Sequence, residues 1–456
     1  MHSEKSFSSR FIEALSIFAQ KVSNQKHIMA IRDAFAAMIP ITIIAAFFLL
    51  VNNVLLDPKS GLFKFIPNVE HWLGIGTQIY NGTLGIMALM AAFLIGNFLA
   101  KSYGMEGRVE GIIAVAAYVV LIPANVPVTS TAGKAFEASG VLTQDLTSPT
   151  GTFLAIIVAL ISTTLLCKFS QSKRLKISMP ESVPPAIAKS FNILIPSFLV
   201  LTILGIVEFS AMSIFHMSIP DIIVKVLQTP LVGGFQTLPG ILLYVFFAGF
   251  LWVFGIHGAF VLGAISGPVL LTSLQQNIDA INAGQTLPNI VTQPFLDAYV
   301  YMGGGGTIIC LVIAIFIASK RPDHRMITKF GLIPSIFNVS EPLMFGLPVV
   351  FNPIYGIPLV IAPLFSTTLA YIATSIGWVA PTYILTPWVT PPLISGYLAT
   401  GGDIRGSILQ VIIIVVGTLI YLPFVIAANR TYTMEPKTQT EKTEQPAEAL
   451  NLEGGN

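Results

Sequence analysis

Two ionisable side chains stand alone in long apolar stretches. Glu341 lies in Phe330–Pro353, FGLIPSIFNVSEPLMFGLPVVFNP, which could cross a bilayer but whose prolines at 334, 342, 348 and 353 would kink or end a helix. Non-helical backbone survives at membrane depth only inside protein or beside a watery cavity. We therefore expect a re-entrant hairpin with Asn338, Ser340 and Glu341 near its tip. A carboxylate there is costly and usually functional, and the alternative is a Glu that caps a broken helix.

His257 is the second such side chain. In GILLYVFFAGFLWVFGIHGAFVLGAISGPVLL it is the only group that titrates near neutrality, and Gly255 and Gly258 flank it. Such a histidine can bind a hydroxyl, relay a proton or act as a base, and the glycines let the backbone bend and a ligand approach. The alternative is a neutral histidine that bonds a carbonyl between helices. Its isolation between glycines favours a functional role.

Three further features are open to two interpretations each. Asn81 follows Tyr80 at the start of an apolar run, so it could line a substrate path or cap a helix. Trp388, within LTPWVTPP, could stack on the face of a sugar or anchor the chain at the membrane interface. The glycine run Gly303–Gly306 lacks the lysine of a phosphate-binding loop, which favours close helix packing or a hinge.

Composition indicates an all-α polytopic membrane protein. Of 456 residues, 54% are hydrophobic and 10% are charged, whereas soluble domains have about 25% charged residues. The formal net charge of +2, without long basic tracts, argues against a nucleic-acid partner. Cys167 and Cys310 lie far apart, so neither a disulfide framework nor a CxxC metal site is expected. We expect no metal and no cofactor.

Apolar runs predict the membrane crossings. We expect about ten in all, with the His257 and Glu341 neighbourhoods as additional re-entrant segments. The clearest crossings are Ala34–Leu56, Ile79–Ala100, Gly111–Val128, Gly151–Cys167, Phe191–Phe215, Gly240–Phe254, Ala298–Ser319, Ile354–Thr374 and Ile408–Asn429.

Basic residues predict the orientation, because Lys and Arg collect on the cytoplasmic side. The basic segments, assigned inside with both termini, are Met1–Arg32, Lys168–Lys189, Lys320–Lys329 and the tail after Asn429. The segments poor in basic residues, assigned outside, are Asp57–Gln78, Thr129–Thr150 and Gln276–Asp297.

Five regions are expected along the chain. Residues 1–33 form a cytoplasmic segment with an interfacial helix whose apolar face carries Phe11, Leu15 and Phe18. Residues 34–190 are an Ala/Ile/Leu-rich transmembrane scaffold, and 191–236 connect it to the second half. Residues 237–430, broken by proline and glycine, are the substrate-binding transmembrane region. Residues 431–456 are polar and are expected to be disordered.

Several motifs resemble one family. SEPLMFGLPVVFNP, FGIHGA, YNGTLGIM, IRDAFAAMIPITI and MPESVPPAIAKSF are similar to segments of the lactose/cellobiose/N,N'-diacetylchitobiose family of phosphotransferase-system (PTS) IIC permeases, in the family's order, from about Phe11 to Asn429. The resemblance implies a two-domain IIC fold and a homodimer that joins through the N-terminal half. It also implies one sugar near the membrane midplane between two re-entrant hairpins. The family's substrate-binding His falls on His257 and its essential Glu on Glu341.

The resemblance also implies partners and a reaction. A β-linked disaccharide such as cellobiose, diacetylchitobiose or lactose would cross the bacterial plasma membrane and be phosphorylated by a cytosolic IIB protein, itself supplied by IIA. Because the 26 residues after Arg430 contain no Cys, we expect IIB to be a separate chain. We expect Glu341 to accept a hydrogen bond from the sugar 6-hydroxyl. Gly258, Asn338, Ser340, Asn81 and Trp388 complete the candidate binding residues.

Two choices stay open in the sequence. Either Glu341 or His257 can serve as the base. The same two residues could instead form the proton relay of a proton-coupled secondary sugar transporter. A passive channel is disfavoured by the broken helices, which favour a bound-substrate site.

The charge pattern gives a test of orientation. Single cysteines introduced into Lys320–Lys329 should not react with a membrane-impermeant thiol reagent added to intact cells, whereas cysteines in Thr129–Thr150 should react. The measurement is reagent-induced mass shift of the purified chain, with permeabilised cells as the positive control. Labelling of the first segment in intact cells would overturn the assignment.

Overall fold

The computed structural model describes residues 24–58, 61–123, 125–129, 135–175, 177, 191–347 and 349–434. The expected interfacial helix with Phe11, Leu15 and Phe18 lies outside these residues, as do most of 176–190 and the tail after residue 434. The last helix, α20 (Ile404–Met434), extends four residues beyond Arg430, where the predicted tail begins.

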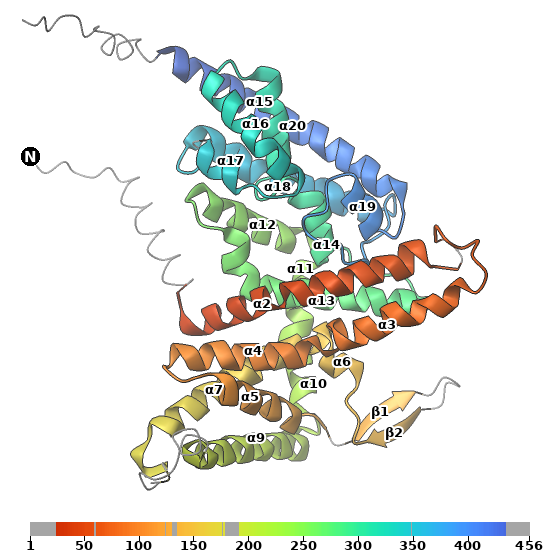
Figure 1. The fold of residues 1–456 in the computed structure, drawn as a ribbon, viewed down its shortest axis with the longest axis vertical. Helices are drawn as coiled ribbons and strands as arrows, with labels where there is room; N and C mark the ends of the chain where they lie inside the picture. Colours follow the sequence, from red (N-terminus) through yellow and green to blue (C-terminus); the bar gives the residue numbers. More distant parts are fainter. Residues whose placement is uncertain are drawn as a thin grey trace, which may run out of the picture.

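The first half is a bundle of long helices (Figure 1). Small side chains let these helices approach closely: the space for a Cβ at Gly96 lies 2.7 Å from the Ala114 Cβ of the neighbouring helix. The elements are α2 (Lys26–Leu50) with its π-helical extension η1 (Val51–Leu55), η2 (Val69–Trp72), α3 (Leu73–Gly82), η3 (Leu84–Ile86), α4 (Met87–Ser102), α5 (Arg108–Val120), α6 (Gln144–Thr147), η4 (Pro149–Gly151), α7 (Thr152–Gln171), η5 (Lys173–Leu175) and α9 (Leu194–Phe215).

The second half consists of shorter helices separated by breaks, as its proline and glycine content predicts. The elements are α10 (Ile219–Ile223), η6 (Val224–Gln228), α11 (Thr229–Phe235), α12 (Leu238–Val253), α13 (Gly258–Asn282), α14 (Gln293–Phe295), η7 (Leu296–Val300), α15 (Ile308–Ala318), α16 (Pro322–Ile336), α17 (Glu341–Gly346), α18 (Pro353–Ser375), α19 (Ile394–Ala399) and α20.

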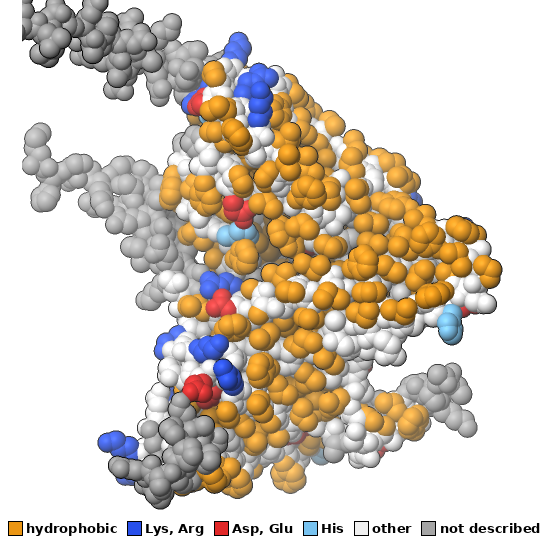
Figure 2. All heavy atoms as spheres, in the orientation of Figure 1, with side chains coloured by type: hydrophobic (Ala, Val, Ile, Leu, Met, Phe, Trp, Pro, Cys, Tyr) orange, Lys and Arg blue, Asp and Glu red, His pale blue; other side chains and the backbone are white. Residues whose placement is uncertain are grey.

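The prediction of an all-α polytopic membrane protein is confirmed. Among the described residues, 7 helices are long and apolar enough to cross a membrane, or up to 8 if a pair bent by 82° at Phe235–Leu238 is one span. Figure 2 shows apolar side chains over most of the visible surface, with Lys and Arg gathered along its left edge. In Figure 1 the same edge holds the start of α2 and the end of α20. The number of crossings stays a prediction.

Two expected crossings have different structures. The apolar run Gly111–Val128 is helical only to Val120, and Asn125–Thr129 forms strand β1, antiparallel to β2 (Ala135–Ser139). Pro123 follows the helix end, where proline cannot continue a helix. The run Ala298–Ser319 contains a loop between η7 and α15, because Gly303, Gly304 and Gly306 adopt φ values of 82°, 98° and 80°.

Both ends of Gln276–Asp297, the segment assigned to the outer face, are helical, and the side of the membrane stays a prediction. Residues up to Asn282 belong to α13, whose 25 residues are long and apolar enough to span, and Asp297 lies in the π-helical turn η7. Polar residues occur within this helical part because buried partners satisfy some of them. Asn277 is fully buried, and its amide nitrogen donates to the carbonyls of Asn289 at 2.8 Å and Thr382 at 3.0 Å.

The structure contains two large hydrophobic cores. One is built from Ala30 to Leu204 with Leu274, Ile278 and Leu385, and the other from Ile241 to Ala428. Because α13 contributes Leu270 to the second core and Leu274 to the first, this helix joins the two halves. The predicted boundaries between scaffold, connecting and substrate-binding regions stay predictions.

Asn277 should therefore be a stability determinant. Replacing it with Leu removes both donated bonds and the bond that its side-chain oxygen accepts from the Asn289 N–H at 2.9 Å. The buried groups left unpaired should lower the free energy of unfolding by about 3 kcal/mol. Thermal melting of the detergent-purified protein measures this. Asn282→Leu, at the exposed end of the same helix, is the matched control and should change little; equal melting temperatures for both variants would contradict the expectation.

Candidate functional site

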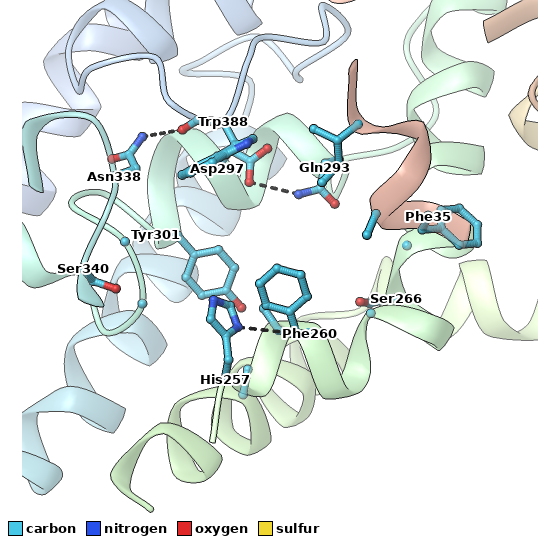
Figure 3. Close-up of a pocket in the computed structure, with 18 of the residues that line it drawn as sticks. Phe35, His257, Phe260, Ser266, Gln293, Asp297, Tyr301, Asn338, Ser340 and Trp388 are labelled. Atoms are coloured by element: carbon cyan, nitrogen blue, oxygen red, sulfur yellow. Dashed lines mark hydrogen bonds between the residues drawn. The ribbon is translucent and has the colours of Figure 1, made fainter. Parts of the chain in front are cut away.

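A cavity of about 510 Å³ lies between the two halves, within the size range of small-molecule sites (Figure 3). Most of its polar groups come from the breaks of the second half. One wall is α2, which contributes mainly apolar side chains such as Phe35, Ile39 and Ile43.

The cavity brings together most of the candidates named from sequence. His257, Asn338, Ser340, Glu341 and Trp388 all line it, although they come from three separate segments. The other two candidates are not among its lining residues. Asn81 accepts a hydrogen bond from Gln144 at 3.5 Å, and Gly258 packs its backbone against Ala248, whose carbonyl occupies the space a Cβ would need.

His257 is the N-cap of α13, directly after the break that ends α12. Its Nδ1 accepts a hydrogen bond from the Phe260 N–H at 3.2 Å, and its ring packs against Trp252 and Phe260 at centroid distances of 4.6 and 4.3 Å. Because Nδ1 is the acceptor, the neutral ring carries its proton on Nε2. His257 therefore offers an N–H donor to a ligand. The Glu341 carboxylate lies close enough to interact electrostatically with this ring.

Glu341 is the first residue of α17, after a break that follows α16. The Ser340 carbonyl starts α17 by accepting from the N–H groups of Leu343 and Met344 at 3.0 and 2.9 Å. Both side chains are fully buried, and Leu343 fills the space beside Gly331 where α16 has no side chain. The helix is thus anchored in the core, while Glu341 remains exposed.

Asn338 holds the break in place. It adopts the left-handed φ of 63°, and its Oδ1 accepts from the Gly303 N–H at 2.8 Å. Its Nδ2 donates to the carbonyls of Trp388 at 2.6 Å and Thr390 at 3.0 Å. Both amide hydrogens are used in this way, so the geometry favours a positioning role for Asn338 over direct sugar binding.

The glycine run Gly303–Gly306 packs tightly behind the cavity. A Cβ at Gly304 would lie 2.6 Å from the Ser340 Cβ, and one at Gly305 would lie 2.5 Å from the Trp252 indole nitrogen. Side chains would push the loop away from Ser340. The sequence favoured close helix packing or a hinge, and the structure shows a closely packed loop; a hinge stays a prediction.

Several lining residues were not identified from sequence. They are the scaffold residues of α2, with Arg32 and Phe35, and a polar group made of Tyr244, Ser266, Gln293, Asp297 and Tyr301. Asp297 was considered only as the end of Gln276–Asp297, a segment assigned outside because it has no basic residue. The available signal was the spacing of Gln293 and Asp297, which places them on one face of a helical turn.

Comparison with known proteins assigns the family. A family model described as "Phosphotransferase system, EIIC" matches residues 32–363. The chain belongs to this family. It is 35% identical over 424 residues to the oligo-beta-mannoside-specific EIIC component of Bacillus subtilis, covering 92% of this chain and 94% of the relative. It is 36% identical over 418 residues to the cellobiose-specific EIIC component of Geobacillus stearothermophilus, covering 89% and 90%.

A solved EIIC structure has the same fold. The crystal structure of the transporter ChbC, the IIC component from the N,N'-diacetylchitobiose-specific phosphotransferase system, matches with a TM-score of 0.87 and 33% identity, covering 93% of this chain and 99% of that one. The family resemblance and the IIC fold expected from sequence are confirmed, and the chain is a multi-pass sugar permease component.

The glycine loop gives a test of how this EIIC site is held. Gly304→Ala should weaken sugar binding by about tenfold or more, because the added Cβ meets Ser340 at 2.6 Å and displaces the Glu341 break. Gly402→Ala is a matched control: its φ of 97° equals the 98° of Gly304, but the nearest atom lies 3.4 Å away. Isothermal titration calorimetry with sugar measures both. Equal losses would show that backbone strain alone is responsible.

Proposed function

We propose that this chain takes up a β-linked disaccharide and delivers it to the cytoplasm as a sugar phosphate. The observation that carries the proposal is the meeting of His257 and Glu341 in one cavity of an EIIC fold. The relatives support the sugar class, because their names specify oligo-β-mannoside, cellobiose and diacetylchitobiose.

The cavity chemistry suits a neutral polyol. Sugar hydroxyls need several placed hydrogen bonds and apolar surface for their ring faces. Glu341 and Ser340 supply acceptors, the His257 Nε2 supplies a donor, and Trp388, which is 44% exposed, supplies an aromatic face. A sugar that leaves one of these polar groups unpaired in the complex would bind more weakly.

Glu341 is the better candidate for the base. The bond from the Phe260 N–H occupies Nδ1 of His257, so the neutral ring presents a proton, not a lone pair, to the sugar. Glu341 then accepts from the 6-hydroxyl and takes its proton as the hydroxyl oxygen bonds to phosphorus. The sulfur–phosphorus bond of phosphocysteine on IIB breaks, and the thiolate leaves with the bonding electrons.

Arg32 can balance the charge of the product. Transfer places a phosphate dianion beside the Glu341 carboxylate, which is unfavourable without a cation. Among the described residues that line the cavity, Arg32 is the basic one, on the α2 wall and paired with Asp33 at 2.9 Å. The presence of Arg32 in the cavity lining supports its assignment as the cation that faces the transferred phosphoryl group.

The cytoplasmic partner is expected to dock beside α16. This helix runs from the basic segment Lys320–Lys329 to the Glu341 break, so a protein bound at its start contacts the same hairpin. The loop is ordered locally: Arg321 donates to Asp323 at 2.7 Å and holds the pKa of that carboxyl below its usual range. In this proposal the basic edge and both termini face the cytoplasm.

The assembly is proposed to be a homodimer through the scaffold half. Helix α9 presents large apolar side chains outward, with Phe198 at 68% and Phe209 at 73% exposure. No residue of α9 is among the described residues that line the cavity.

Glu341→Gln separates binding from chemistry. The variant keeps the shape and one acceptor oxygen but loses the charge, so sugar affinity should fall about tenfold to a hundredfold. Phosphoryl transfer should fall by a further 10²–10⁴-fold or so, because the base is lost. Both are measured on the same monodisperse protein in proteoliposomes, with and without phosphorylated IIB.

Glu208→Gln is the control for Glu341→Gln, and two results would contradict the proposal. Glu208→Gln changes a carboxylate that accepts from the Ile219 N–H at 2.9 Å in the scaffold half, so transfer per folded molecule should be unchanged. Full transfer by Glu341→Gln would remove Glu341 from the reaction. Uptake of unmodified sugar driven by a pH gradient, without phosphorylated IIB, would instead support a proton-coupled transporter.

A further inference from the structure

The cavity has a second group of polar side chains, separate from His257 and Glu341. It consists of Gln293 and Asp297, from α14 and η7, and both side chains line the cavity. In the view of Figure 3, Tyr301 and Trp388 lie between this pair and the side where Asn338 and Ser340 are. Gln293 and Asp297 therefore line the same space as His257 and Glu341.

The local structure fixes Asp297 rigidly. Thr292 caps α14 by accepting from the Phe295 N–H at 3.3 Å, and the Tyr301 N–H closes the π-turn on the Leu296 carbonyl at 2.9 Å. The flanking residues Leu296, Ala298, Tyr299 and Val300 are at most 1% exposed. Asp297 remains partly accessible from the cavity. Turns of this π-helical kind occur frequently at functional sites.

The carboxylate is only partly satisfied by the protein. Its Oδ1 accepts from the Gln293 Nε2 at 2.9 Å, and no other hydrogen bond to it comes from the described part of the chain. Within the same residues it forms no ion pair. A carboxylate kept in such a place is costly unless hydrogen-bond donors reach it.

We infer that Gln293 and Asp297 form the subsite for the second sugar ring, the one that does not carry the reacting hydroxyl. This inference rests on the proposed function. The second carboxylate oxygen accepts from one ring hydroxyl, and the remaining Gln293 N–H donates to the oxygen of a neighbouring group. Because a carboxylate only accepts, the subsite selects rings with a hydroxyl or amide N–H at that position.

Truncating the ligand tests the assignment. The probes are the β-linked disaccharide that the wild-type chain binds most tightly among cellobiose, mannobiose and diacetylchitobiose, and the methyl β-glycoside of its non-reducing ring. Asp297→Asn should lower disaccharide affinity about tenfold to a hundredfold and leave methyl glycoside affinity within about twofold. A role in stabilising the π-turn would lower the melting temperature without distinguishing the two ligands.

The chain contains a matched control. Asp279 repeats the same arrangement on α13, where the Gln275 Nε2 donates to its Oδ1 at 2.8 Å, but neither residue lines the cavity. Asp279→Asn should change neither affinity. If Asp297→Asn is not monodisperse, Gln293→Met replaces it in the test. Gln293→Met should weaken disaccharide binding about threefold to tenfold and leave binding of the methyl glycoside nearly unchanged.

The outcomes separate this inference from the proposed function. Equal losses for both ligands, or no loss for the disaccharide, would overturn the second-ring subsite. If Glu341→Gln weakens both ligands while Asp297→Asn and Gln293→Met weaken neither, the subsite falls and the proposed function stands. If the folded wild-type chain binds none of the disaccharides, the proposed sugar class and the subsite both fall.

Discussion

The site depends on how the N–H and C=O groups of unwound backbone find hydrogen-bond partners within an apolar protein. Each helix break leaves N–H and C=O groups without helical partners, and in a membrane no bulk water replaces them. The Asn338 amide supplies the replacement for several segments at once, through Gly303, Trp388 and Thr390. A second link joins Phe351 to the Val253 carbonyl at 2.8 Å, next to the His257 break. The Glu341 break is therefore bonded to the glycine loop and to the Trp388 segment, and the His257 break is bonded to the segment that follows α17.

Much of this arrangement was predictable from residue types. An apolar chain with prolines and glycines in its second half must contain broken helices there, and an isolated His257 or Glu341 in such a region has few structural reasons to exist. The sequence could not predict that Asn338 would hold the break, because its bonds reach residues about 35 and 50 positions away. The prolines and glycines predict the break, but they do not predict the residues to which it is bonded.

The differences from the expected elements share a physical cause, because charge counts and hydropathy do not report which partners a residue finds in the fold. Gln276–Asp297 was assigned outside because it has no basic residue, a count that says nothing of how Asn277 and Asp297 are bonded. Asn277 donates to the carbonyls of Asn289 and Thr382, whereas Asp297 accepts one hydrogen bond from Gln293 and is only partly satisfied. Likewise the run Gly111–Val128 is apolar to its end but helical only to Val120, because hydropathy alone does not distinguish helix from strand.

The two halves of the chain contribute differently to the cavity. His257, Glu341, Asn338 and Asp297 are all tied by hydrogen bonds to segments of the second half, so their relative positions do not depend on α2. Helix α2 adds mainly apolar surface and packs on α13, which contributes to both cores. Recognition of a ligand is thus built within one half, whereas enclosure of that ligand depends on the contact between halves. A substitution on the apolar face of α2 and one at the breaks therefore affect different properties of the same cavity.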